Sequence, residues 1–368
     1  MTGTGDIDGR YMSRALRLAV RGLRTCAPNP AVGCVIANGD RIVGEGFHAR
    51  AGEPHAEVFA LRQAGERAGG ATAYVTLEPC SHHGRTPPCA PALVEAGVSR
   101  VVVATGDSHP RVAGQGIGIL RAAGVEVVTG VCESQTRRIN RGFFSRLERG
   151  RPWLTLKVAA SLDGRSALAD GTSRWITGPV ARAAVHRSRA RAGAVLTGVG
   201  TVLADDPALN VRLAGVERQP LRVVLDSKLS TPPDARLFGE PGGAVHLFCT
   251  LDDDGRRRAL EAAGATIHMT GADAAGRPQW RAVMGTLAAL GVNDVYAECG
   301  PRLAGALIAS DLVDELDLFQ GPHLLGPGAH PFAMLGDQVG IPEPPMWRIL
   351  SATRCGRDTR TRLQPEKR

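Results

Sequence analysis

Two short motifs place four chemically distinctive residues within one stretch of the chain. PHAEVFA carries His55 and Glu57 two positions apart, and TLEPCSHHGRTPPC carries Cys80 and Cys89, each directly after a proline. One imidazole and two thiolates form a three-ligand zinc site whose fourth position stays open, which is the arrangement of catalytic zinc sites. The sequence therefore predicts that His55, Cys80 and Cys89 bind Zn²⁺, with the Glu57 carboxylate beside the metal to relay protons.

The order H-x-E followed by two P-C pairs is also the signature of zinc deaminases, in which the glutamate moves protons and is not a ligand. The alternative is a closed structural zinc site, for which His48, His82 or His83 would supply a fourth ligand. Eight residues separate Cys80 from Cys89, more than in the short P-C-x-x-C form. This polar insert, SHHGRTPP, is expected to line the mouth of the site.

The length of the chain and its pattern of elements indicate two α/β domains. A chain of 368 residues is long for one hydrophobic core. Apolar strands alternate with amphipathic helices on both sides of LERGRP, so we expect one domain over 1–150 and another over 151–368. No apolar run approaches the roughly 20 residues of a membrane span, and MTGTGDIDGR lacks a signal-peptide core, so we expect a cytoplasmic protein without a membrane partner.

The periodicity of apolar residues predicts the elements of each domain. In the first domain we expect a hairpin around the Asn38-Gly39 turn, strands near 73–77, 100–105 and 125–129, and helices near 10–25, 55–67, 89–97, 116–124 and 132–150. In the second we expect strands from Trp153 and near 194–197, 221–225, 244–249, 265–269, 294–298 and 315–319, with helices near 178–192, 254–263, 280–290 and 301–309.

Charge and aromatic content argue against nucleic acid as the partner. The formal net charge is +8, but six basic and two acidic residues within 354–368 supply +4 of it. Aromatic residues, which would stack on bases, make up only 4% of the chain. The remaining positive field suits a phosphorylated small substrate or cofactor. A zinc-stabilised nucleic-acid-binding protein that uses the basic tail stays open as an alternative.

Several motifs together resemble one enzyme family. NPAVGCVI, PHAEVFA and TLEPCSHHGRTPPC resemble the deaminase half of the bifunctional riboflavin-biosynthesis deaminase–reductases, while LKVAASLDGRSA, SRWITGP, TVLADDPALNVR and ECGPRLAGAL resemble the reductase half. The resemblance implies a cytidine-deaminase-like first domain and a dihydrofolate-reductase-like second domain. It also implies zinc-dependent hydrolytic deamination of a phosphorylated pyrimidine, diaminohydroxyphosphoribosylaminopyrimidine, followed by NADPH-dependent reduction of the ribosyl group to a ribityl group. A zinc nucleoside or tRNA deaminase with an inactive reductase-like domain is the rival, and homo-oligomerisation stays open.

The resemblance implies roles for individual residues. In the deaminase half, His55, Cys80 and Cys89 look like zinc ligands, Glu57 looks like the proton shuttle, and the pyrimidine and its ribose phosphate are assigned to Asn29, His48 and Arg85. In the reductase half, NADPH is assigned to Ala159, Trp175, Thr201, Asp205, Ser227, Gly300, Pro301, Arg302, Leu303, Ala304, Gly305 and Ala306. Substrate contacts there are assigned to Lys157, Ser173, Arg189, Leu209, Arg212 and Glu298.

The residue types fit these roles, although structural alternatives exist for several of them. The 300–306 segment runs from a strand end into a helix, whose free N–H groups suit pyrophosphate, and arginines can grip phosphate bidentately. Against this, Asn29 is also typical of a turn, Trp175 of a core, Arg189 of a solvated helix face and Lys157 of a strand end. The chain departs from the family pattern at His109 and Cys299.

Overall fold

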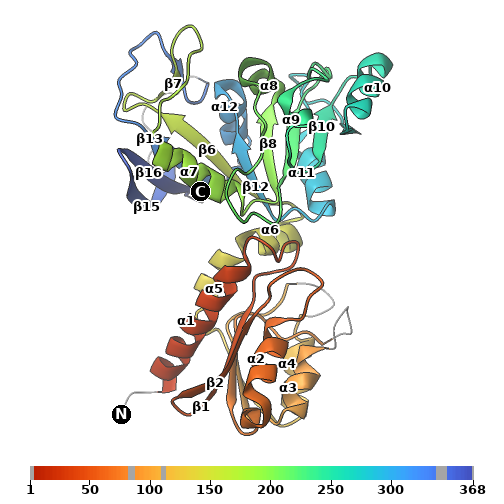
Figure 1. The fold of residues 1–368 in the computed structure, drawn as a ribbon, viewed down its shortest axis with the longest axis vertical. Helices are drawn as coiled ribbons and strands as arrows, with labels where there is room; N and C mark the ends of the chain where they lie inside the picture. Colours follow the sequence, from red (N-terminus) through yellow and green to blue (C-terminus); the bar gives the residue numbers. More distant parts are fainter. Residues whose placement is uncertain (1–3, 82–87, 109–112, 337–345, 367–368) are drawn as a thin grey trace. The chain divides into compact units, whose positions relative to one another are not determined.

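The computed structural model describes residues 4–81, 88–108, 113–336 and 346–366. They form two compact units, Met1–Arg151 and Pro152–Arg368 (Figure 1). Each unit has its own sheet and its own hydrophobic clusters. Within the described ranges, no helix combines the length and the apolar character that crossing a membrane requires.

The first unit is built on a five-stranded sheet in the order β2-β1-β3-β4-β5. Its strands are β1 (Gly33–Asn38), β2 (Arg41–Phe47), β3 (Thr72–Val75), β4 (Arg100–Val103) and β5 (Glu126–Thr129). β1 pairs antiparallel with β2 and with β3, whereas β3, β4 and β5 run parallel. The predicted hairpin is confirmed, and Gly39 at its turn has φ +55°, a conformation that glycine adopts without strain.

Helices cover both faces of this sheet. They are α1 (Thr4–Gly22), α2 (Ala56–Ala64), α3 (Cys89–Glu95), α4 (Gln115–Ala122), α5 (Glu133–Ile139) and α6 (Arg141–Arg149). Side chains alternate along β1, so Val35 packs with α1 while its neighbours Cys34 and Ile36 belong to the cluster that contains α2 and α3. The predicted α/β/α layering is therefore confirmed. The helical stretch expected over 132–150 is confirmed as two helices, α5 and α6, which meet at Asn140.

Close packing of α2 on β2 fixes the start of the helix that follows His55. A Cβ atom added at Gly46 would lie 2.2 Å from the carbonyl oxygen of Ala56, far inside van der Waals contact. Only glycine lets the strand approach the first turn of α2 this closely. The backbone around His55 and Glu57 is thus held against the sheet.

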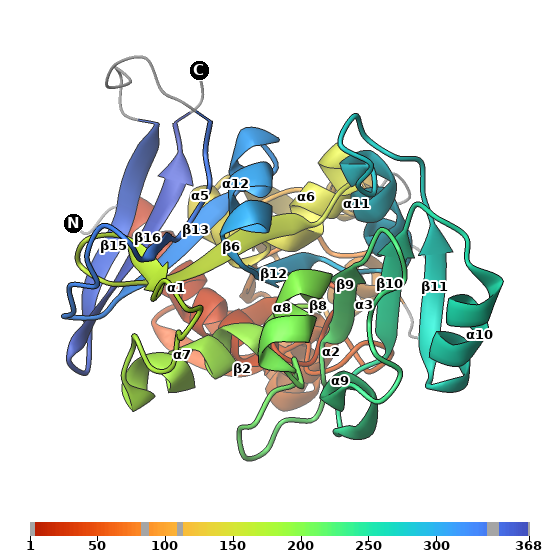
Figure 2. The ribbon, with the colours of Figure 1, turned by 90° about the horizontal axis from the view of Figure 1, so that it is seen from above.

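The second unit contains a nine-stranded sheet in the order β11-β10-β9-β8-β12-β6-β13-β16-β15, seen from above in Figure 2. Neighbouring strands from β11 to β13 are parallel, and β16 and β15 are added antiparallel. The strands are β6 (Trp153–Ala160), β8 (Ala194–Gly198), β9 (Leu221–Leu225), β10 (Val245–Cys249), β11 (Ala265–Met269), β12 (Asp294–Glu298), β13 (Glu315–Gln320), β15 (Trp347–Cys355) and β16 (Asp358–Pro365). A separate two-stranded sheet pairs β7 (Arg165–Ala167) with β14 (His330–Pro331).

The helices of this unit include the predicted α7 (Pro179–Arg189), α10 (Asp254–Ala262), α11 (Trp280–Ala289) and α12 (Pro301–Ala309), and two short ones that periodicity did not predict, α8 (Val199–Asp205) and α9 (Arg236–Gly239). The central strands are hydrophobic and buried, as expected for parallel strands covered on both faces. Because parallel strands end at the same edge of a sheet, residues that follow β6, β8, β9 and β12 come close together there.

The basic C-terminal stretch forms a β-hairpin, which the sequence did not predict. Arg360 of β16 donates two hydrogen bonds to Asp317 of β13, at 2.7 and 2.8 Å, and Arg362 binds Glu315 in the same bidentate way, at 2.7 and 2.9 Å. Both carboxylates are buried. These two arginines therefore neutralise acids inside the sheet and do not form a free basic tail.

Candidate functional site

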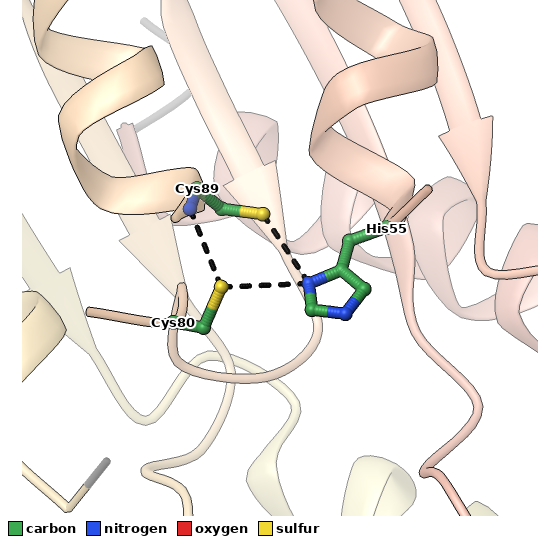
Figure 3. Close-up of side chains that lie close together, drawn as sticks. All are labelled: His55, Cys80 and Cys89. Atoms are coloured by element: carbon green, nitrogen blue, oxygen red, sulfur yellow. Dashed lines mark hydrogen bonds between the residues drawn. The ribbon is translucent and has the colours of Figure 1, made fainter. Parts of the chain in front are cut away.

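Three side chains with metal-binding atoms meet in the first unit (Figure 3). The Nδ1 atom of His55 lies 3.4 Å from the Sγ atoms of both Cys80 and Cys89. All three atoms lie within 4.8 Å of one another. Donors that share a tetrahedral zinc ion at bond lengths of about 2.0–2.3 Å stand about 3.5 Å apart. The geometry and the donor set both fit such an ion.

Local secondary structure places each of the three side chains. His55 is the residue immediately before α2, so the helix begins one residue later than the sequence predicts. Cys80 follows β3, and Cys89 is the first residue of α3. The Cys89 N–H donates to Cys80 Sγ at 3.3 Å. Hydrogen bonds from Cys89 and His55 hold the pKa of Cys80 well below its usual range, which favours the thiolate that binds metals.

Glu57 is buried in the first turn of α2 without a full set of hydrogen bonds. Its side chain is 3% exposed, and its Oε2 atom has no hydrogen-bond partner among the described residues. Burial raises the pKa of Glu57 to about 7. A buried polar atom without a partner is unfavourable unless a ligand satisfies it. Glu57 is thus suited to accept and return a proton at neutral pH.

His48 and Asn29 lie next to this cluster. Asn29 Nδ2 is 3.1 Å from His48 Nε2, and His48 Nδ1 is 3.2 Å from the carbonyl oxygen of Pro54. The ring of His48 stands edge-on to that of His55, with centroids 5.3 Å apart. Both ring nitrogens of His48 therefore have partners other than the thiolates, so His48 does not complete a closed four-ligand site. His82, His83 and Arg85 lie outside the described residues, as does most of the insert that contains them.

A second cluster of candidate residues lies in the second unit. The Arg189 guanidinium, at the end of α7, binds both carboxylate oxygens of Glu298, with Nη2 3.0 Å from Oε2, and donates through Nη1 to the carbonyl oxygen of Asn210 at 2.8 Å. Glu298 ends β12 and is in register with Lys157 of β6. Arg212 is exposed, and its Nη1 donates to Asn210 Oδ1 at 3.2 Å.

These contacts change what can be expected of the two arginines. The side chains of Arg189 and Glu298 are only 12% and 13% exposed, so Arg189 is not part of a solvated helix face. All three nitrogens of its guanidinium also donate to Glu298 or the main chain, whereas the exposed Arg212 guanidinium donates to Asn210 through Nη1. Leu209, just before Asn210, is buried with φ +51°, and Ser173 is half-buried.

The candidate cofactor residues at the start of α12 differ in exposure from those further along the helix. Gly300 precedes α12, which has Pro301 in its first turn, and a Cβ atom at Gly300 would lie 3.9 Å from Thr201 Oγ1. Ala304 and Gly305 lie on the other side of the same helix and are buried, with Gly305 against the backbone of Met334. The exposed residues of α12 and its start are thus the ones placed to meet a ligand.

The remaining cofactor candidates lie on several elements. Trp175 is 62% exposed, with the Arg182 guanidinium 4.3 Å from its ring centroid, so the alternative that it is a core residue is wrong. Asp205 ends α8, and its carbonyl oxygen accepts from Arg174 Nη2 at 3.0 Å. Ser227 follows β9, and Ala159 is half-buried in β6; Arg302 is exposed, whereas Leu303 and Ala306 are half-buried.

Comparison with known proteins identifies the family. Residues 6–105 match the family model described as the cytidine and deoxycytidylate deaminase zinc-binding region, and residues 152–361 match the RibD C-terminal domain. The riboflavin biosynthesis protein RibD of Escherichia coli K12 is 45% identical over 363 residues, which cover 95% of this chain and 97% of that protein. The chain belongs to the RibD family. The resemblance predicted from the motifs is confirmed.

Solved RibD structures have the same fold. One form of Acinetobacter baumannii RibD superposes with a TM-score of 0.89 at 43% identity, covering 98% of this chain and 99% of that one. A Thermotoga maritima diaminohydroxyphosphoribosylaminopyrimidine deaminase/5-amino-6-(5-phosphoribosylamino)uracil reductase superposes with a TM-score of 0.87 at 32% identity, covering 99% and 100%. The two-domain fold expected from the sequence is confirmed along nearly the whole RibD chain.

Two further residues near the candidate sites, Glu78 and His186, were not singled out by the sequence analysis. The buried carboxylate of Glu78, two positions before Cys80, accepts hydrogen bonds from the backbone of Asp107, Gly114, Gly116 and Ile117 at 3.0–3.3 Å. His186 Nδ1 accepts from the backbone of Arg212 at 3.3 Å. A buried acid and a histidine on a basic helix were the available signals. Cys299 packs beside the second unit's core, and His109 lies outside the described residues.

Proposed function

We propose that this RibD-family protein is a bifunctional enzyme of riboflavin biosynthesis. Its first unit hydrolytically deaminates diaminohydroxyphosphoribosylaminopyrimidine, and its second unit reduces the ribosyl group of the deaminated product to a ribityl group. The observation that carries the proposal is the convergence of three zinc-ligating atoms beside a buried glutamate with an unpartnered oxygen. The family membership and the substrate printed for the Thermotoga maritima relative support the choice of substrate.

In the deaminase unit, His55, Cys80 and Cys89 would hold one zinc ion per chain. A zinc ion held there acidifies water near neutral pH. Glu57 takes a proton from the attacking water and delivers it to the pyrimidine ring, and a further proton transfer lets the amino group leave as ammonia. One water is consumed and one ammonia is released for each amino group replaced by oxygen. Asn29, beside His48, offers amide donor and acceptor atoms to the pyrimidine edge.

In the reductase unit, the strand ends position the substrate and the cofactor. NADPH supplies a hydride when it is bound. Lys157 and Arg212 offer positive charge to the ribose phosphate. Arg189 holds the carboxylate of Glu298, which is in register with Lys157. The start of α12 presents free N–H groups toward the cofactor's pyrophosphate, as helix starts do for anions.

Coupled turnover tests the whole proposal. Purified protein supplied with the phosphoribosylamino-pyrimidine should release ammonia, and with NADPH also present it should oxidise one NADPH for each ammonia released. Ammonia release without NADPH oxidation would support the rival, a deaminase with an inactive reductase-like unit. If neither reaction occurred in zinc-loaded protein, the proposed function would be rejected.

Replacing one ligand should remove the metal. We expect Cys80→Ser to lose most of its bound zinc, because a neutral hydroxyl is a much weaker ligand than a thiolate. Metal analysis after dialysis measures this against about one zinc per chain in the unaltered protein. Cys132→Ser is the control, since Cys132 is also half-buried but belongs to no ligand cluster in the described part of the chain. Full zinc retention by Cys80→Ser would contradict the assigned ligand set.

Cofactor binding should be visible through Trp175. We expect NADPH to quench tryptophan fluorescence more strongly than NADH at equal concentration, because the exposed Lys228 beside Ser227 offers charge to the additional 2′-phosphate. Trp175→Phe should remove most of the change, while Trp280→Phe, in a helix that packs on the core, should not. Equal quenching by NADPH and NADH would contradict the preference, and quenching unchanged in Trp175→Phe would contradict the position of the cofactor.

A further inference from the structure

Asn140 makes an unusual contact between two distant parts of the first unit. It stands where α5 ends and α6 begins and is 5% exposed. Its Oδ1 accepts from the Ala31 N–H at 2.7 Å, and its Nδ2 donates to the Ala31 carbonyl oxygen at 3.0 Å. One side-chain amide thus satisfies both backbone polar groups of a residue that is itself 1% exposed. Neither family model covers this segment, since one ends at residue 105 and the other begins at residue 152.

Ala31 belongs to the NPAV segment that carries Asn29. The Asn29 N–H donates to the Cys26 carbonyl oxygen at 2.9 Å, which places the Asn29 side chain 3.1 Å from His48 Nε2. On the other side of Ala31, the Val32 carbonyl oxygen accepts from the His48 N–H at 2.9 Å. His48 in turn reaches the carbonyl oxygen of Pro54, one residue before the ligand His55. The backbone that Asn140 holds is therefore the backbone that aims Asn29 and His48 at the metal cluster.

A second, longer hydrogen bond joins α6 to the residue just before the NPAV segment. Arg146 Nη2 donates to the Pro28 carbonyl oxygen at 3.4 Å. Thr136, one turn before Asn140, is fully buried, and its hydroxyl has no hydrogen-bond partner among the described residues. Phe143 and Phe144 fill the core beside them. The two bonds from Asn140 therefore give the α5–α6 junction a directional polar contact with the NPAV segment, in addition to its apolar packing.

We propose that Asn140 is a positioning residue of the deaminase site, which holds the NPAV segment so that Asn29 meets the substrate's pyrimidine edge. The inference rests on the proposed function and adds to it. It makes the α5–α6 region, which follows the zinc-binding part of the chain, a component of substrate recognition. A contact to the pyrimidine edge that is made equally in the bound substrate and in the transition state affects KM more than kcat.

The first test separates positioning from folding. Asn140→Ala should raise the KM for the phosphoribosylamino-pyrimidine at least about tenfold and change kcat much less, because binding is lost and proton transfer by Glu57 is not. Zinc content and NADPH oxidation by the second unit should stay unchanged. Thr136→Val is the matched control, since it alters a buried polar side chain on α5 whose hydroxyl has no hydrogen-bond partner in the described part of the chain; its KM should equal that of the unaltered protein. A folded, zinc-loaded Asn140→Ala with unaltered KM would overturn the proposal.

A second variant keeps the proposal testable if Asn140→Ala does not fold. Asn140→Asp keeps an acceptor for the Ala31 N–H but places a carboxylate oxygen against the Ala31 carbonyl oxygen, so it should raise KM in the same direction. In the Asn29→Ala background, Asn140→Ala should cause little further increase in KM, because the two residues act through one contact. Fully additive effects would overturn the proposed route through Asn29.

Amide hydrogen exchange tests the inference without an activity assay. In Asn140→Ala, amides of residues 26–33 should exchange at least about tenfold faster, whereas those of β4 should not change. Equal exchange of residues 26–33 in variant and unaltered protein would overturn the inference even if both were active. Absence of ammonia release from the unaltered protein would instead reject the proposed function, so the two failures are distinguishable.

Discussion

Glu57→Gln is expected to lower the rate of ammonia release at least about 100-fold while zinc stays bound, since a positioned acid–base group contributes roughly 10²–10⁴-fold. The carboxylate is buried, and its Oε2 atom has no partner among the described residues. Glutamine keeps the size of the side chain and one acceptor oxygen but cannot take up a proton at neutral pH. The loss should therefore appear in kcat more than in KM.

Three measurements make this result specific to proton transfer. Metal analysis should show the same zinc content as the unaltered protein, and NADPH oxidation with the deaminated substrate should be unaffected. Glu66→Gln, an exposed glutamate just beyond α2, should leave ammonia release unchanged. Turnover within a few-fold of normal in zinc-loaded Glu57→Gln would show that another group moves the proton.

The convergence of His55, Cys80 and Cys89 could be predicted from sequence because these residues depend on local structure. Cys80 follows a strand, and His55 and Cys89 stand at helix starts, so spacing and flanking prolines reveal where each side chain points. The contacts around them could not be predicted in this way. Asn140 binds Ala31 across 109 positions, and only tertiary packing brings the two together. The helical stretch expected over 132–150 carried no sign of the break at Asn140, because that break involves neither glycine nor proline.

The charge pattern misled the interpretation of the C-terminal stretch. Its arginines look like a solvated basic tail, since in β16 they alternate with threonines and few apolar residues mark a strand. The structure instead pairs Arg360 and Arg362 with buried acids of β13, so the strand's inward face is ionic. This removes much of the basis for a nucleic-acid-binding alternative, because these two charges are already matched. Sequence periodicity counts apolar residues and misses a strand that is held by ion pairs.

The second large effect is expected at the Arg189–Glu298 pair. Removing one partner of a buried ion pair leaves an uncompensated charge and costs roughly 3–5 kcal/mol of unfolding free energy. Arg189→Met should therefore lower the unfolding free energy of the second unit by roughly 3–5 kcal/mol. It should also abolish most NADPH oxidation, because Glu298, in register with Lys157, loses the guanidinium that holds its carboxylate in place. Denaturant unfolding followed by Trp fluorescence, with ammonia release as the control for the first unit, measures both.

The pH dependence of the unfolding free energy of Arg189→Met tests whether the charge of Glu298 causes the instability of this variant. In the unaltered protein, burial alone would raise the pKa of Glu298, but Arg189, helped by Lys157 and His186, outweighs it and holds the pKa below its usual range. The pair thus stabilises the fold above the ordinary glutamate pKa, and this contribution is lost as pH falls through the lower, folded pKa. In Arg189→Met, burial is less opposed and the pKa of Glu298 should rise. Protonation of Glu298 then removes the uncompensated charge as pH falls, so the difference in unfolding free energy between the variant and the unaltered protein should narrow as pH falls.

A double replacement separates the charge from its role in the reaction. Arg189→Met/Glu298→Leu removes both buried charges and should recover much of the lost stability, as apolar replacements of buried ion pairs often do. It should not recover NADPH oxidation, because the Glu298 carboxylate and the Arg189 guanidinium are both absent. Arg236→Met, which breaks an exposed pair with Glu240, should change stability little and serves as the control. Recovery of both stability and activity in the double variant would show that the pair only fills space. If the stability deficit of Arg189→Met instead widened at low pH, Glu298 would not be the group left without a counter-charge.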